Sequence, residues 1–260
     1  MILYGLSATY SIFLLRKQFR EDNRINYFLL LAAFGFHTMA MFVRGLSLNR
    51  CPINNLYEAT TFVAWTMVAA YLVIGLWARL RFLGAFASPL LFAIGVFALL
   101  TPKDVGLVKP EFTGGGLTLH VALFALAYGA FGLSSVAGLM YLTQERDLKM
   151  HKLRAVLSFM PPIQRLELIT GRLLLSGFAM LSAALIASAL FLHQQGGAVF
   201  RGDFKILWSL FVWALYFGLI IMRWKFWQGG RRFAWGTVCA FAFVLLTFWG
   251  SSLMSPLHRP

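Results

Sequence analysis

The chain has 260 residues, of which 60% are hydrophobic and only 12% are charged, and its mean hydropathy is +0.74. This composition excludes a soluble globular domain and predicts an integral membrane protein. The net charge of +14 comes from short basic clusters between apolar runs without an RNA-binding signature, so we expect no nucleic-acid partner.

The apolar runs predict an all-α, polytopic bundle of about eight transmembrane helices in a single membrane domain over residues 1–260. The expected spans are 2–15, 27–43, 56–77, 82–100, 117–142, 173–191, 206–222 and 233–253. Most of them approach the roughly 20 residues that cross a bilayer, and the first is short. The N-terminus has neither a basic region nor a cleavage site, so we expect a span there rather than a removable signal.

The basic residues predict the orientation of the bundle. Most of the 23 Lys and Arg residues fall in the odd-numbered connections, which we therefore place on the cytoplasmic side, with both termini outside. The longest of these connections follows the fifth span. At about 148–162, Leu153, Val156, Leu157 and Met160 recur at helical spacing among basic residues, which predicts an amphipathic segment at the inner interface that ends at Pro161-Pro162. This segment either anchors in the membrane surface or docks a cytoplasmic partner.

On the outer side, Asn55 and Glu58 have the spacing of a capping box at the start of the third span. The alternative is that Glu58 steers a cationic or metal-bearing ligand. The two cysteines, Cys51 and Cys239, form no C-x-x-C pair, so we expect neither a thiol redox motif nor a zinc knuckle.

The five histidines are distributed unevenly across the predicted membrane. His151 belongs to an inner connection, whereas the others fall toward the outer face: His37, His120, His193 and His258. His120 opens the fifth span after a run of glycines, and ionisable groups at membrane depth are candidates for function. Two imidazoles from separate helices suit the two axial positions of a haem iron, and equally copper or zinc. For any single histidine, an interfacial residue without a ligand is the alternative.

The approach to the seventh span carries an aromatic stripe. Phe200, Phe204, Trp208 and Phe211 follow helical spacing, so they could line a porphyrin or simply pack in the interface. Arg201 and Lys205 could pair with propionates or mark the interface.

Four stretches resemble the cytochrome c assembly protein family (the CcsA, CcmC and HemX group). Residues 52–59, PINNLYEA, are similar to its "FPLSNLYES" segment, and residues 119–128, LHVALFALAY, to its "LHVxxxxLSYA" helix. Residues 162–178 resemble the family's entry to the next span, and residues 245–258 resemble its "YFGVNLLxxGLHS" ending. Order and spacing agree from about residue 50 to the end.

The resemblance implies a haem-handling membrane protein with haem b as the bound group. In the family, the histidines of the "LHV" helix and of the C-terminal motif are outer axial ligands, which correspond here to His120 and His258. The family's tryptophan-rich outer segment, "WGSYWSWDPKETW", cradles haem and meets apocytochrome. Asp203, Lys205 and Trp208 stand in its positions, with Phe204 between them, and His37 and His193 are further possible ligands.

Two departures favour haem binding over haem delivery. The other tryptophans of the outer segment are absent, and Ile221-Met222-Arg223 stands where some members carry a histidine before an arginine. The chain therefore resembles the reduced, HemX-like branch of the family more than a complete synthetase.

We thus expect a multi-pass protein of a bacterial-type inner (cytoplasmic) membrane, in contact with lipid, haem and a cytochrome assembly partner. It would act in cytochrome c biogenesis or in regulating tetrapyrrole metabolism. No nucleophile-and-base pair or paired carboxylates are apparent, so we expect no independent catalytic activity. The main alternative is a scaffold or assembly subunit that keeps the fold without haem. A transporter is less favoured because the halves show no repeat with broken helices.

Overall fold

The computed structural model describes residues 1–16, 23–48, 56–76, 81–100, 115–150, 161–194, 204–225 and 229–254. These residues form eight α-helices and confirm the all-α prediction. The helices are α1 (Ile2–Arg16), α2 (Arg24–Leu48), α3 (Leu56–Gly75), α4 (Leu83–Leu100), α5 (Gly115–Lys149), α7 (Ile163–Gln194), α8 (Phe204–Trp224) and α9 (Arg231–Met254).

Six of the helices in the described ranges are long and apolar enough to cross a membrane, namely α2, α3, α4, α5, α7 and α8. The chain is therefore a multi-pass membrane protein. α1 is apolar but shorter, as its sequence predicts. Large apolar side chains such as Phe28, Phe36 and Phe42 are exposed along α2, as expected for a helix that faces lipid.

α5 and α7 are longer than the spans predicted for them. α5 continues through the polar residues 143–149, and α7 begins ten residues before the predicted span, directly after Pro162. Hydropathy identifies only the apolar residues that lie in the hydrocarbon core of the membrane. An α-helix continues beyond them for as long as its backbone hydrogen bonds are made. Residues 151–160 lie outside the described residues, so the amphipathic segment remains a prediction.

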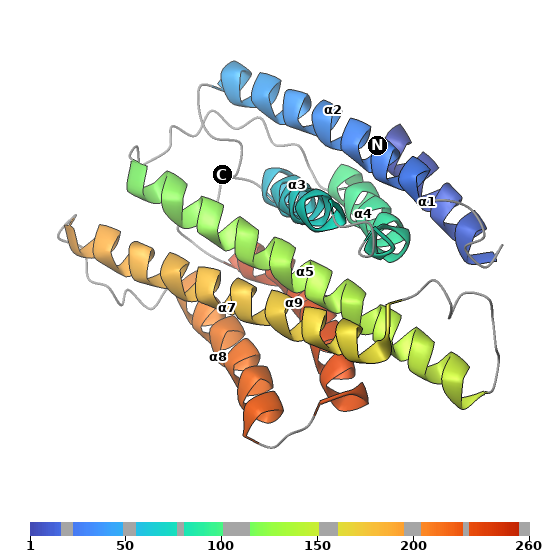
Figure 1. Cartoon of the computed structure of the whole chain (residues 1–260). Helices are drawn as coiled ribbons and strands as arrows, with labels where there is room; N and C mark the ends of the chain where they lie inside the picture. The colour runs from blue at the N-terminus through green and yellow to red at the C-terminus, as the bar shows by residue number, and fades with distance from the viewer. Residues whose placement is uncertain are drawn as a thin grey trace.

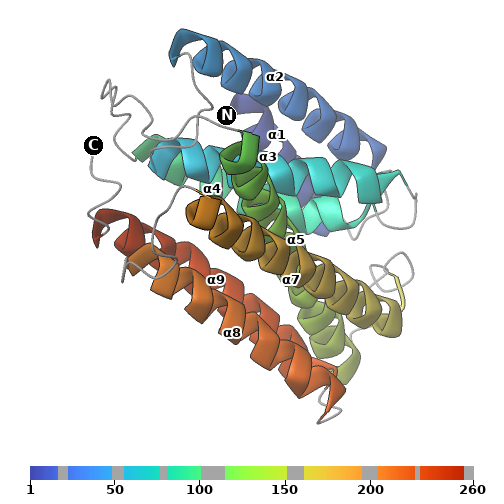
Figure 2. The same ribbon diagram turned by 90° about the vertical axis from the view of Figure 1, so that its left-hand side faces the viewer.

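α5 is the central helix of the bundle (Figures 1 and 2). α1 and α2 lie on one side, with α3 and α4 between them and α5, and α7, α8 and α9 lie on the other side. α5 packs along α7 and also contacts α3 and α9. It consequently joins both halves of the molecule.

Two clusters of buried apolar side chains form the interior. The first core lies among α1–α4 and residues 133–140 of α5, where Leu133, Val136 and Met140 are fully buried. The second core lies among α5, α7, α8 and α9. It consists of Ala127, Tyr128, Phe131, Leu174, Leu181, Val212, Tyr216, Phe233, Ala240, Phe241 and Val244. Both cores therefore depend on α5.

A buried polar cluster ties α1, α2 and α4 together. The Ser7 hydroxyl donates to Asn26 Oδ1 at 2.6 Å and lies 2.7 Å from the Ser88 hydroxyl. The Asn26 amide donates to Ser88 Oγ at 3.3 Å. All three side chains are fully buried. In a membrane, such interhelical hydrogen bonds help to select the packing partner of each helix.

We expect Asn26→Ala to lower the free energy of unfolding by about 1–2 kcal/mol, because it removes the central member of this buried network. The measurement is unfolding of the purified protein in mixed micelles by increasing amounts of a denaturing detergent, followed by circular dichroism. Thr9→Ala on α1 is the control, since the exposed Thr9 hydroxyl donates only to the Leu6 carbonyl of its own helix. A loss no larger than that of the control would contradict a stabilising role for the network.

Candidate functional site

His120 lies in the second turn of α5 and is held by α7. Its Nδ1 atom is 2.8 Å from the carbonyl oxygen of Ala184, and its ring is half-buried. A carbonyl oxygen can only accept a hydrogen bond, so Nδ1 must carry the proton. In the neutral imidazole the lone pair is then on Nε2. This is the arrangement by which metal-binding histidines are usually oriented.

Aromatic side chains extend from His120 along one face of α5. The His120 ring is 5.4 Å from that of Phe124, and Phe124 stacks on Tyr128 at 5.4 Å. Phe131 continues the series one turn further and stacks against Tyr216 of α8 at 3.6 Å. The imidazole thus lies at one end of an apolar, aromatic interior.

Trp208 of α8 lies against the same interior. Its ring packs on Phe211 at 5.5 Å and on Phe243 of α9 at 5.8 Å, and Trp208 and Phe124 both contact the second core. Trp208 and Phe211 are the described part of the predicted aromatic stripe. The indole Nε1 is buried, and the structure gives it no acceptor among the described residues. A buried donor without a partner is costly, and a bound acceptor would satisfy it.

These features fit a porphyrin. His120 offers a free imidazole nitrogen, aromatic rings line the interior beside it, and Trp208 offers an unused N–H. In the part of the chain that the structure describes, no three His, Cys, Asp or Glu side chains gather in one place. A single imidazole beside aromatic side chains would suit haem, because the porphyrin nitrogens themselves would supply most of the ligands of the iron.

The remaining predicted ligands are placed as follows. His37 belongs to α2, a helix that α3 and α4 separate from α5 (Figure 1), and its Nδ1 is 3.0 Å from the Tyr4 hydroxyl. His193 is in the last turn of α7, and Phe204 and Lys205 begin α8, but the side chains of all three lie outside the described residues. Asp203 and His258 are also outside them. The pairing of His120 with His258 therefore stays a prediction.

Glu58 has a partner that the sequence does not indicate. It stands third in the first turn of α3, as a capping box requires, but its carboxylate accepts a hydrogen bond from Arg44 Nε of α2 at 2.9 Å. Glu58 is only 1% exposed, and the Arg44 guanidinium also lies over the Tyr57 ring at 5.2 Å. Because Asn55 is outside the described residues, its capping contact stays a prediction. Arg44 directly follows the predicted span 27–43, and nothing in the sequence pairs it with Glu58 of the next span.

Comparisons with known proteins agree over almost the whole chain. A family model described as "Cytochrome C assembly protein" matches residues 53–258, a range that includes His120, Ala184, Trp208 and His258. The chain is 26% identical to "Protein HemX" of Brevibacillus brevis over 96% of this chain and 92% of that protein. It is 24% identical to "Protein HemX" of Bacillus subtilis (strain 168) over 99% and 94%. With "Cytochrome c biogenesis protein CcsA" of Guillardia theta, identity is 24% over 84% of this chain and 78% of that protein.

Proposed function

This chain belongs to the cytochrome c assembly protein family, as its motifs predict, and from that premise we propose that it binds haem b at the outer face of the membrane. His120 and His258 are the proposed axial ligands. We further propose that all eight helices lie in a bacterial-type inner membrane, with both termini outside. The excess of Lys and Arg in the odd-numbered connections supports that orientation.

The orientation of His120 is the observation that carries the proposal. The Ala184 carbonyl fixes the proton on Nδ1 and thereby leaves Nε2 with its lone pair. A histidine that served only as an interfacial side chain would have no need of a fixed tautomer. This contact joins α5 to α7, so the packing of the two helices positions the ligand.

Each of the other residues has a part that follows from its chemistry. Bound haem would supply an iron for which His120 and His258 would be the protein ligands. Phe124 and Tyr128 keep the His120 ring in place and exclude water from its inner side. The Trp208 N–H is buried without an acceptor among the described residues, and we propose that it would donate to an acceptor such as a propionate oxygen. Asp203 and Lys205 stand beside it in the sequence, and we propose that Lys205 offsets propionate charge.

A HemX-like role is favoured over a full CcsA-like role. The match covers 92% and 94% of the two HemX proteins but 78% of the Guillardia theta CcsA. The outer segment before Trp208 also lacks the family's other tryptophans. We therefore propose haem binding in cytochrome c biogenesis or in regulation of tetrapyrrole metabolism, together with a membrane partner, rather than haem delivery by this chain alone.

The absorption spectrum of the full chain, purified with haem supplied, tests this function. We expect a low-spin spectrum typical of two histidine ligands. His120→Ala and His258→Ala should each convert it to a high-spin spectrum and weaken haem binding by about 100-fold or more, since even the residues that merely orient a ligand contribute 10- to 100-fold.

His37→Ala is the matched control, because His37 bonds to Tyr4 of α1 and belongs to α2, which α3 and α4 separate from α5 (Figure 1). It should leave the spectrum unchanged. A folded wild-type protein that binds no haem would favour the alternative, a scaffold that keeps the fold without it. A spectrum lost in His37→Ala but kept in His120→Ala would contradict the assigned site.

A further inference from the structure

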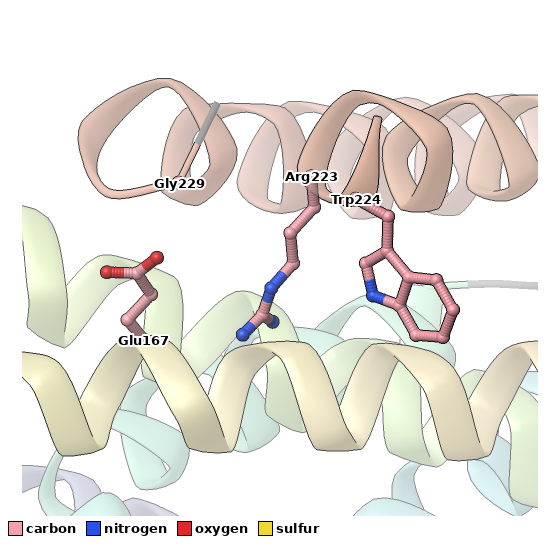
Figure 3. A pocket seen from close by; sticks show the side chains of 4 residues that line it. All are labelled: Glu167, Arg223, Trp224 and Gly229. Carbon is pink, nitrogen blue, oxygen red and sulfur yellow. The ribbon is translucent and has the colours of Figure 1, made fainter. Parts of the chain in front are cut away.

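A second candidate site lies at the opposite end of the bundle from His120. Glu167, Arg223, Trp224 and Gly229 line an open cavity of about 440 Å³ between α7, the end of α8 and the residue Gly229 that precedes α9 (Figure 3). Glu167 precedes Ala184 by 17 residues of α7, which separates the two ends by about 25 Å. The cavity is therefore distinct from the proposed haem site.

Arg223 is held in this cavity by two neighbouring helices. Its guanidinium carbon lies 4.9 Å from the centre of the Phe233 ring on α9. One of its terminal nitrogens rests against Gly171 of α7, in the space that a Cβ atom at that position would fill. The absence of a side chain at residue 171 thus makes room for a fixed positive charge.

Glu167 supplies a separate negative charge on the same face of α7. It stands four residues before Gly171, one helical turn away. Its carboxylate lies against Gly229, where there is no room for a Cβ atom, and the next residue, Gly230, turns the chain with a φ of 66°. Figure 3 shows the carboxylate and the guanidinium in the same gap between the ribbons. Among the ion pairs of the described residues, none joins Glu167 to Arg223.

The two charges lie beside an aromatic side chain typical of the membrane surface. Trp224 is 67% exposed, and tryptophan prefers the depth of the lipid headgroups. A ligand here would meet a fixed cation, a separate anion and an indole at the interface. An anionic headgroup would satisfy Arg223 but would be repelled by Glu167.

We propose that this cavity binds the headgroup of phosphatidylethanolamine. The phosphate accepts hydrogen bonds from the Arg223 guanidinium, the ammonium donates to the Glu167 carboxylate, and Trp224 packs beside the glycerol region. Phosphatidylcholine can place its phosphate similarly, but its quaternary ammonium has no N–H to donate. The site would thus discriminate by hydrogen bonding as well as by charge.

Native mass spectrometry of the full chain tests this proposal. The protein is equilibrated with an equimolar mixture of phosphatidylethanolamine, phosphatidylcholine and phosphatidylglycerol, and the lipid molecules that remain bound to it are counted. We expect phosphatidylethanolamine to be retained about fivefold more than either other lipid, the preference that one hydrogen bond to a charged group at an accessible site can supply. Equal retention, or a preference for phosphatidylglycerol, would overturn the proposal.

Matched variants test whether the lipid preference comes from Glu167 itself or from the overall charge at this end of the bundle. Glu167→Gln should abolish the preference, whereas Glu145→Gln should keep it, because Glu145 lies at the same end of the bundle but pairs with Lys149 and Arg231. Arg223→Lys, which keeps the charge without the planar fork, should reduce retention. A preference that survives Glu167→Gln would refute the assigned contact.

A water-soluble competitor distinguishes a lipid from a free phosphate ester. If O-phosphoethanolamine binds the protein while no phosphatidylethanolamine is retained, the ligand is a soluble compound and the lipid proposal is wrong. If retained phosphatidylethanolamine resists this competitor, its acyl chains contribute to binding, as expected for a lipid held at the surface of α8.

Discussion

Replacing Gly129 with valine is expected to lower the free energy of unfolding by about 3 kcal/mol, the upper part of the usual range for overpacking. A Cβ atom at this position of α5 would lie 2.8 Å from Thr66 Oγ1 and 3.0 Å from the backbone nitrogen of Met67, both on α3. A side chain can rotate away, but the backbone of α3 yields only if the helices separate. That separation would also break the 2.8 Å hydrogen bond from Thr66 Oγ1 to the Ala125 carbonyl.

Gly218→Val is the matched control for this substitution. Gly218 lies in the middle of α8, and a Cβ atom there would meet no other heavy atom within 4 Å. Both substitutions add the same apolar volume and the same helix-propensity cost, so their difference isolates the contact between α3 and α5. Detergent-induced unfolding followed by circular dichroism measures it. Equal losses in the two variants would contradict the close contact between α3 and α5 at Gly129.

Arg44→Met is the second substitution with a large expected effect, a loss of about 3 kcal/mol in the free energy of unfolding. It removes the guanidinium from a carboxylate that is almost fully buried, and breaking a buried pair by removing one partner is strongly destabilising. The methionine is long enough to keep much of the apolar packing of the arginine stem. The same unfolding measurement applies.

The double variant Arg44→Met/Glu58→Leu provides the control. With neither member of the pair present, it should recover most of the stability lost in Arg44→Met, because the cost arises from a buried carboxylate that has lost its guanidinium partner. A double variant as unstable as the single one would indicate that lost packing, rather than lost charge, is responsible.

The sequence predicts the helices well but their neighbours poorly. Apolar runs located all eight helices because hydropathy depends only on local composition. The central position of α5 depends instead on small residues at helix contacts, such as Gly129 and Gly177. The local sequence does not indicate which helix packs against such a residue. The same limit applies to Arg44 and Glu58, since a span's sequence fixes the depth of a charge but not the direction in which it points.

The same distinction applies to the candidate site, where the sequence predicts individual residues but not their hydrogen-bond partners. Histidine at a helix mouth was enough to select His120, and helical spacing was enough to pair Trp208 with Phe211. The hydrogen-bond acceptor of His120 could not be predicted, because it is a main-chain carbonyl and every residue has one. The bond of His37 to Tyr4 could not be predicted either, because it depends on how α1 packs on α2.

The main-chain partner of His120 also affects how the site can change in evolution. A side-chain acceptor disappears with one codon change, whereas the Ala184 carbonyl persists whatever residue occupies position 184. Selection on the imidazole's orientation therefore acts on the spacing of α5 and α7, through tight positions such as Gly177, which faces the Ala127 carbonyl and the Phe131 ring. Homologues can diverge widely in residue identity and still inherit the same tautomer, provided that small residues persist where these two helices touch.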